Sequence, residues 1–236
     1  MVAGQAGRLI HFLGFVFALV ASACAFAETP SIDSAKQVLD SIISLGAASG
    51  MEYAIVVEKG TQQVYCFTYD GVFRERYRLR CSTGKVVGDK AVSGDKKTPE
   101  GIYFVTKNCP SKYLAPLYGA RALPIDYPNL ADRLEGRSGH SIWLHGTNKP
   151  LKERDSNGCI VLENEAINRL ANDITLLQTP VIIVDKLSWV SESAVTPEKD
   201  AILSFIGKWR ESLENGRFED FQLFYNEAAI RDIDWW

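Results

Sequence analysis

A cysteine and a histidine stand close enough in this sequence to act together as nucleophile and base. Residues 142–164 read I-W-L-H-G-T-N-K-P-L-K-E-R-D-S-N-G-C-I-V-L-E-N, so that an apolar run ends at His145 and a polar turn presents Cys159. A thiol attacks as its thiolate, and a neighbouring imidazole is the usual means of forming it near neutral pH. Gly158 permits a sharp turn whose backbone amides would face a developing oxyanion. This pattern predicts cysteine-dependent acyl transfer.

An inert thiol packed beside a structural histidine is the alternative interpretation, because free cysteines are among the most buried residues. The polar turn that carries Cys159 follows a charged loop, which is an unusual place for core packing. We therefore favour the catalytic interpretation. A metal site made by His140, His145 and Cys159 is a weaker hypothesis, since the spacing matches no compact zinc pattern and lacks a fourth ligand. We expect no metal and no cofactor.

The motif H-G-T at 145–147 followed by S-x-G-C-I at 156–160 resembles the signature of the YkuD-type L,D-transpeptidase catalytic domain. This cysteine-dependent family acts on bacterial peptidoglycan. Further fragments resemble its loops in the same order, namely S-T-G at 82–84, G-D-K at 88–90, G-D at 94–95, T-P-E-G at 98–101, D-Y-P-N at 126–129 and T-P-V-I at 179–182. The resemblance covers about residues 52–186. It implies a mainly β, β-sandwich-like catalytic domain with short helices, which we place at residues 51–187.

The resemblance also assigns roles within the motif. Cys159 would form a thioester with a peptidoglycan stem peptide, His145 would act as the base, and the carbonyl of Gly146 would orient the imidazole. Ser156 and Asn157 would complete the turn that supports the oxyanion. An amine acceptor would make the enzyme a transpeptidase, and water would make it an L,D-carboxypeptidase. The sequence leaves both open, and a non-catalytic wall-binding module is a further alternative.

Two positions depart from the family pattern, since many members have His where Asn157 stands and Arg where Val161 stands. The missing arginine implies a different recognition of the substrate carboxylate. Arg121 and Arg133 are candidates for that contact, because guanidinium binds carboxylates in a bidentate way.

The remaining substrate-binding candidates are Tyr127, Thr147 and His140. His140 lies five residues before His145. If the two shared a strand they would point to opposite faces, which places His140 in a structural role or on the cleft rim.

Length and composition describe an ordinary globular chain behind a secretory signal. The 236 residues are 46% hydrophobic and carry a net charge of −3, which gives no reason to expect nucleic acid as a partner. Residues 1–27 combine Arg8, an apolar core at 9–24 and a small-x-small cleavage site at 25–27. Cys24 raises lipidation as a weaker alternative. We expect export to the periplasm or cell envelope, without membrane insertion once the signal is cleaved.

Four cysteines would remain in the mature chain, and export permits a disulfide between them. A hairpin turning at residues 70–71 would not place Cys66 opposite Cys81, so their register implies no disulfide. We expect these two side chains to pack in strands and Cys159 to stay reduced. The state of Cys109 is open.

The remaining patterns predict elements around the motif. Residues 31–45 have a helical spacing of apolar residues, as do 164–174, whereas 53–57, 63–69, 72–79, 101–106 and 181–185 resemble strands. Arginines at 74, 76, 78 and 80 alternate, which predicts one basic strand face, solvated or else contacting an anionic substrate. Residues 84–101 form a long loop of the kind that is usually functional or mobile. Residues 109–139 are irregular and would form a wall of the cleft.

The C-terminal part has a different character. We expect a linker at 188–197 and amphipathic helices at 198–214 and 218–225. The pair resembles the opening of a nuclear transport factor 2-like domain, which would need a further sheet. The combination with the catalytic domain resembles cell-shape-determining L,D-carboxypeptidases.

Overall fold

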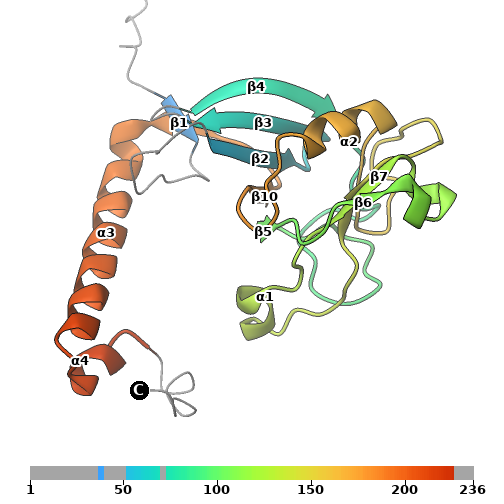
Figure 1. Ribbon diagram of the computed structural model, residues 1–236. Helices are drawn as coiled ribbons and strands as arrows, with labels where there is room; N and C mark the ends of the chain where they lie inside the picture. The colour runs from blue at the N-terminus through green and yellow to red at the C-terminus, as the bar shows by residue number, and fades with distance from the viewer. Residues whose placement is uncertain (1–36, 40–51, 70–72, 226–236) are drawn as a thin grey trace, which may run out of the picture. The chain divides into compact units, whose positions relative to one another are not determined.

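The computed structural model describes residues 37–39, 52–69 and 73–225, and its largest element is a five-stranded sheet (Figure 1). The sheet has the order β4-β3-β2-β10-β5. Only the β2–β10 pair is parallel. The strands are β2 (Glu52–Glu58), β3 (Gln63–Tyr69), β4 (Phe73–Arg80), β5 (Gly101–Phe104) and β10 (Pro180–Val184). These agree with the strands predicted from the sequence to within about two residues.

A second sheet of four strands carries the predicted nucleophile and base. Its order is β6-β7-β8-β9, and β8 and β9 run parallel with Leu144 opposite Ile160. The strands are β6 (Cys109–Pro110), β7 (Arg121–Pro124), β8 (Trp143–His145) and β9 (Ile160–Val161). Because β8 ends at His145 and β9 follows Cys159 directly, two neighbouring strands hold both residues.

The main hydrophobic core lies between these sheets, as the predicted sandwich-like fold requires. It joins residues of the large sheet, such as Ile55 and Ile183, to Leu123, Leu144 and Ile160 of the small one. A smaller cluster, Val56, Tyr65, Phe67 and Ile182, covers the opposite face of the large sheet. Burial on both faces explains why β2 is a continuous apolar run rather than an alternating one.

Short helices complete the catalytic domain. The helix α2 (Asn164–Ala171) buries Ile167, Leu170 and Ala171 and packs against β7 and β8. The helix α1 (Leu130–Leu134) starts at a capping box made by Asn129 and Asp132. The segment expected to be irregular also contains two 3-10 turns, η1 (Ser111–Tyr113) and η2 (Pro116–Tyr118).

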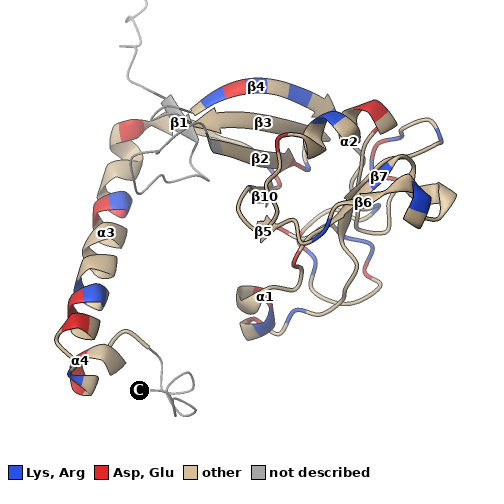
Figure 2. Cartoon of the chain, viewed as in Figure 1, with Lys and Arg blue, Asp and Glu red and all other residues tan. Residues whose placement is uncertain are grey.

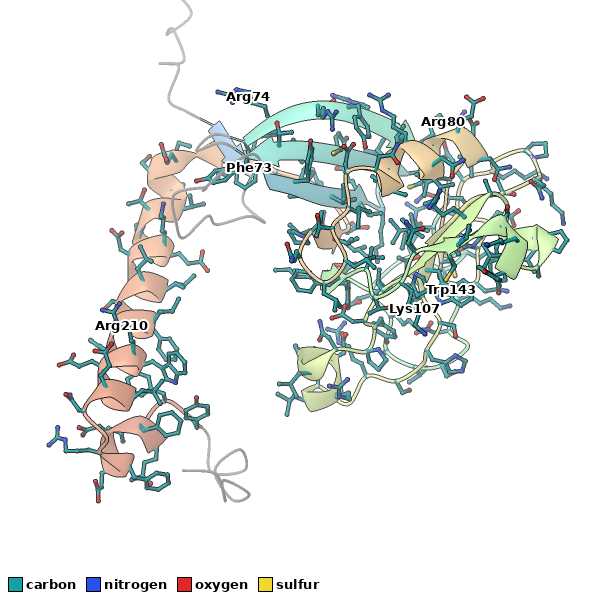
Figure 3. All side chains as sticks on the ribbon, in the orientation of Figure 1. Phe73, Arg74, Arg80, Lys107, Trp143 and Arg210 are labelled. Atoms are coloured by element: carbon teal, nitrogen blue, oxygen red, sulfur yellow. The ribbon has the colours of Figure 1, made fainter. Side chains whose placement is uncertain are left out.

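The alternating arginines of β4 do not share one face. The register shifts by one residue between Cys66 and Phe67, so that Arg76 has no partner in the ladder. Arg76 forms an ion pair with Asp173 on the α2 side, whereas the guanidinium of Arg78 lies over Tyr65 on the other face. Figure 2 shows the basic residues along β4, and Figure 3 shows Arg74 and Arg80 towards its two ends. The predicted single basic face is therefore wrong, because the bulge interrupts the alternation.

Two predictions for the flanking segments are also corrected. Within residues 31–45, expected to be helical, the described residues form β1 (Gln37–Leu39), which pairs antiparallel with β11 (Trp189–Ser191). Pairing with a distant strand overrides a short helical periodicity. The expected linker at 188–197 contains β11 and the first turns of a helix. Pro197 lies inside that helix. The remainder of 31–45 and the predicted signal lie outside the described residues.

The C-terminal helices are present as predicted, and the first is longer. They are α3 (Glu192–Glu214) and α4 (Phe218–Gln222). The Trp209 indole donates to the Tyr225 hydroxyl at 2.9 Å, and the rings of Phe205 and Phe224 meet edge to face. No helix of the described ranges, α3 included, has the length and apolar character needed to span a membrane.

Candidate active site

His145 and Cys159 line the same cavity, which has a volume of about 830 Å³. One wall comes from the segment around η2, a second from residues 139–142, and a third from the loop 147–157. The long loop after β4 contributes Lys90, Ser93 and Gly94. The structure therefore brings the predicted nucleophile and base into one open site, and residues 109–139 form part of its wall as expected.

The imidazole of His145 is buried and held from two sides. Its Nδ1 lies 2.7 Å from the carbonyl oxygen of Gly146, and the ring of Tyr118 meets it edge to face at 5.1 Å. Since a carbonyl only accepts hydrogen bonds, Nδ1 carries the proton and Nε2 is left with a lone pair. Burial lowers the pKa of His145, and the bond to Gly146 opposes that effect in part. The histidine is therefore a neutral base at neutral pH.

Gly146 is a glycine because two other segments cross it. A Cβ on Gly146 would lie 2.4 Å from Oδ1 of Asn164 and 3.0 Å from the amide nitrogen of Ala120. The same Asn164 oxygen accepts a hydrogen bond from the Ala120 amide at 2.8 Å. The Asn164 side chain thus lies between Gly146, after β8, and Ala120, before β7. This contact holds the Gly146 carbonyl in place beside His145.

The turn before Cys159 is held by its own polar groups. The Oγ of Ser156 donates to the Cys159 carbonyl at 2.6 Å and accepts from the Gly158 amide at 3.0 Å. The Gly158 carbonyl accepts a hydrogen bond from Thr98 at 2.9 Å. Gly158 has a φ of 127°, and a Cβ there would lie 2.8 Å from the Lys97 carbonyl oxygen. Close approach of the loop 84–101 therefore requires a glycine.

This geometry changes the expected oxyanion donors. The Gly158 amide is already bonded to Ser156, so it does not face the cavity as a free donor. Within the described part of the chain, the amide of Cys159 itself has no recorded acceptor. The amide of Asn157 likewise has no acceptor among the described residues, so the Asn157 and Cys159 amides both remain for a developing negative charge.

The thiol of Cys159 lies 3.5 Å from the carbonyl oxygen of Ser141 and donates to it. Ser141 has a φ of 60°, a left-handed conformation that a serine adopts only at a cost. Burial raises the pKa of the Cys159 thiol, while a backbone hydrogen bond from Trp143 and the charge of Lys90 act in the opposite direction. The resting pair is therefore a neutral thiol and a neutral imidazole.

Two buried lysines anchor the loop 84–101. From the sequence they were expected only to be turn or loop residues. Lys59 is buried, pairs with Glu100 at 2.8 Å, and donates to the carbonyls of Gly88 and Thr98. Lys90 is also buried and pairs with Asp95 at 2.7 Å. The sequence shows that the loop is rich in lysine and acidic residues, but only the folded structure shows which of them form ion pairs.

Asp95 in turn organises the loop. Burial alone would raise its pKa, but the hydrogen bond from Lys90 and those from the backbone amides of residues 97, 92 and 91 lower it to about 2. The carboxylate is therefore charged at neutral pH. An ordered loop, rather than a mobile one, borders the cavity.

The predicted substrate-binding residues separate into two groups. Thr147 and His140 line the cavity, and His140 is exposed on its rim with Nδ1 2.9 Å from the Ser141 hydroxyl. Asn157 also lines it, as does Val161.

Arg121, Arg133 and Tyr127 are not among the cavity-lining residues. Arg121 bonds to the side chains of Asn168 and Asn108. Arg133 bonds to the Pro128 carbonyl, and Tyr127 is buried with its hydroxyl on the Ser138 carbonyl. All three side chains therefore bond to groups outside the cavity, Arg133 and Tyr127 within the segment 109–139 and Arg121 to residues on either side of it.

The other cysteines behave as packing residues. Cys66, Cys81 and Cys109 are free thiols, the first two buried in the core. Burial raises the pKa of Cys66 and Cys81, the latter to about 12. Among the described residues, no group of His, Cys, Asp and Glu is arranged to hold a metal ion.

Comparisons with known proteins agree with this geometry. The family model for the YkuD L,D-transpeptidase catalytic domain matches residues 52–183. The putative L,D-transpeptidase YafK of Escherichia coli K12 is 31% identical over 104 residues, which are 43% of this chain and 37% of that protein. The match thus spans little more than a third of the length of that curated relative.

Solved structures extend the likeness beyond the catalytic domain. Bd1075 of Bdellovibrio bacteriovorus superposes with a TM-score of 0.68 at 32% identity, covering 81% of this chain and 69% of that one. The helical cell shape determining protein Pgp2 of Campylobacter jejuni gives a TM-score of 0.63 at 28% identity, covering 80% and 65% of the two chains.

Proposed function

The chain belongs to the family of YkuD L,D-transpeptidase catalytic domains, and from this premise we propose that it is a cysteine-dependent acyltransferase acting on the L,D peptide bonds of peptidoglycan stem peptides. The observation that carries the proposal is the cavity that His145 and Cys159 both line, with Nδ1 of His145 bonded to the Gly146 carbonyl. Each is positioned by a neighbouring strand of one sheet.

The first half of the reaction acylates the enzyme. The thiol sulfur attacks the carbonyl carbon of the L,D bond while Nε2 of His145 takes the thiol proton. The Cys159 amide stabilises the oxyanion of the tetrahedral intermediate. The intermediate collapses by breaking the C–N bond, and the imidazolium returns its proton to the leaving amine. A thioester and a neutral histidine remain.

The second half transfers the acyl group. An amine of another stem peptide, or water, attacks the thioester, and His145 accepts a proton from the attacking group. The C–S bond breaks, and the thiolate regains that proton from the imidazolium. The amine acceptor yields a cross-link, and water yields a shortened peptide, so transpeptidation is our first candidate and L,D-carboxypeptidation the second. The relative named as a cell-shape determinant supports a role in shaping the cell wall.

The location of the substrate supports export. Peptidoglycan is outside the cytoplasm, and residues 1–27 have the sequence of a secretory signal. We further propose that α3 and α4 open a nuclear transport factor 2-like module.

Mass spectrometry of a disaccharide tetrapeptide incubated with the protein tests the proposal. Tripeptide alone identifies a carboxypeptidase, whereas cross-linked dimers or exchanged terminal D-amino acids identify a transpeptidase. The variant Cys159→Ala should form neither, and its wild-type melting temperature would show that the fold is intact. Turnover by Cys159→Ala equal to that of the wild type would disprove the thioester mechanism, and the absence of any product from both proteins would favour a wall-binding module.

A further inference from the structure

The loop 147–155 forms one wall of the cavity and carries its unpaired positive charge. Four side chains charged at neutral pH line the cavity, namely Lys90, Lys149, Lys152 and Asp155. Lys90 pairs with Asp95, and Asp155 pairs with Lys85 at 3.4 Å. Among the residues that the structure describes, Lys149 and Lys152 have no recorded ion-pair partner.

The backbone of this loop is held at both ends, which fixes the positions from which the two lysine side chains extend. At the start, the Asn148 side chain donates to the Pro116 carbonyl at 2.8 Å, and the Lys149 amide donates to the Thr147 hydroxyl at 3.0 Å. At the end, the amides of Arg154 and Asp155 donate to the side chains of Gln62 and Ser82. Both ammonium groups remain exposed to incoming ligand.

A cavity with excess positive charge on one wall favours an anionic ligand. Lys90 also lines the cavity but is paired with Asp95, so the unpaired positive charge comes from Lys149 and Lys152. Exposed lysines are strongly hydrated point charges, so they suit a carboxylate that stays partly in water.

We propose that Lys149 and Lys152 form a carboxylate subsite that recognises the free terminal carboxylate of the stem peptide. The inference rests on the proposed function. In a tetrapeptide the terminal carboxylate belongs to the residue directly after the scissile bond, about one Cα–Cα step of 3.8 Å from the attacked residue. With the scissile carbonyl at Cys159, this carboxylate lies in the same cavity that Lys149 and Lys152 line. The subsite thereby selects peptides that end after the L,D bond.

Binding to an inactive enzyme tests the subsite apart from the chemistry. Calorimetric titration of a disaccharide tetrapeptide into Cys159→Ala should give a dissociation constant that rises about three- to ten-fold for each of Lys149→Gln and Lys152→Gln, as expected for a charge-assisted hydrogen bond at a wet site. Added salt should weaken binding to the parent protein more than to the double variant. Lys107→Gln, an exposed lysine outside the cavity, is the matched control and should bind as the parent does.

Modified peptides identify the carboxylate. Amidation of the terminal carboxylate should weaken binding to the parent protein and leave the double variant unaffected. Amidation of another carboxylate of the peptide instead should change neither protein's affinity, and a loss of affinity there with none at the terminus would overturn the assignment.

The two proposals fail in different ways. Peptide binding that depends on the lysines, without turnover by the wild type, would refute the proposed reaction and keep the subsite. Turnover with unchanged affinity in the double variant would refute the subsite and keep the reaction. Absence of binding by the parent Cys159→Ala protein would refute the subsite.

Discussion

Replacing Gly158 by alanine puts a methyl group where the turn before Cys159 has no room for one. An ideal Cβ would lie 2.8 Å from the Lys97 carbonyl oxygen and 3.1 Å from Cδ1 of Ile142. A carbon and a carbonyl oxygen settle at roughly 3.3–3.6 Å, so the two segments must separate by about 0.5–0.8 Å. The backbone φ of 127° adds a cost, because side chains other than hydrogen disfavour it.

The two effects have different expected sizes. A residue held in a sparsely populated backbone region costs of order 1–3 kcal/mol, so we expect Gly158→Ala to lose about 2–3 kcal/mol in free energy of unfolding. For a domain of this size that corresponds to a fall in melting temperature of roughly 4–12 °C. Displacement of the adjacent nucleophile should lower kcat/KM about 10- to 100-fold.

Gly136→Ala is the control that distinguishes the steric clash of an added Cβ from the cost of a positive φ. Gly136 also has a positive φ, 73°, but nothing lies within 4 Å of its ideal Cβ, and it does not line the cavity. It should lose about 1–2 kcal/mol and keep wild-type turnover.

Thermal unfolding by circular dichroism and tetrapeptide turnover by mass spectrometry measure both quantities. The rate at which iodoacetamide labels Cys159 gives a third readout that does not depend on the substrate. Equal stability losses in the two alanine variants, with wild-type turnover and labelling in Gly158→Ala, would refute the described packing of the turn.

Three further predictions concern protonation. Burial lowers the pKa of His145 below the ordinary histidine value of 6.5. The acid limb of the pH profile of kcat/KM should therefore have its midpoint below pH 6.5. A midpoint above pH 6.5 would contradict the buried, neutral imidazole. Because burial raises the pKa of Cys159, iodoacetamide labelling in the absence of substrate should keep rising with pH beyond the midpoint of a free cysteine. Lys90→Met removes a positive charge that lowers the pKa of the Cys159 thiol, so iodoacetamide labelling near neutral pH should slow, whereas Lys85→Met on the surface should not change it. Equal labelling rates of Cys159 in the two variants would show that the charge of Lys90 does not stabilise the thiolate.

The loop 84–101 explains how a domain with few long helices holds its nucleophile. Lys59, which directly follows β2, donates a hydrogen bond to the Thr98 carbonyl. The Thr98 hydroxyl in turn donates to the Gly158 carbonyl. The Thr98 hydroxyl also accepts the Gly84 amide, so one side chain joins both ends of the loop to the cysteine turn. Substitutions in this loop are expected to act on turnover through Cys159.

Much of the site was predictable because its key residues lie within one short stretch of sequence. The motif placed Cys159 after a small-residue turn and His145 at the end of an apolar run, and β8 and β9 then form as neighbouring strands. The Gly146 carbonyl lies within hydrogen-bonding distance of Nδ1 of His145, the contact that its predicted orienting role requires. These relations are local, so composition and spacing are enough to suggest them.

The substrate-binding predictions depended on distant contacts, and there the sequence was a poor guide. Arg121 and Arg133 have the right chemistry for a carboxylate, but their partners are Asn168, Asn108 and the Pro128 carbonyl. The lysines of the loop 147–155 were visible in the sequence, yet nothing local distinguishes a solvated lysine from one on a cavity wall.

What the sequence by itself determined is the types of side chain at the site and the positions of most strands along the chain, since thiol, imidazole, glycine turn and apolar periodicity are all encoded within a few neighbouring residues. The tertiary structure alone decided the state and surroundings of those groups. Burial raises the pKa of Cys159 and lowers that of His145, and the bulge opposite Cys66 divides the arginines of β4 between two faces. Each of these effects arises from segments that meet only in the folded chain, where desolvation and strand register are set by partners far away in the sequence.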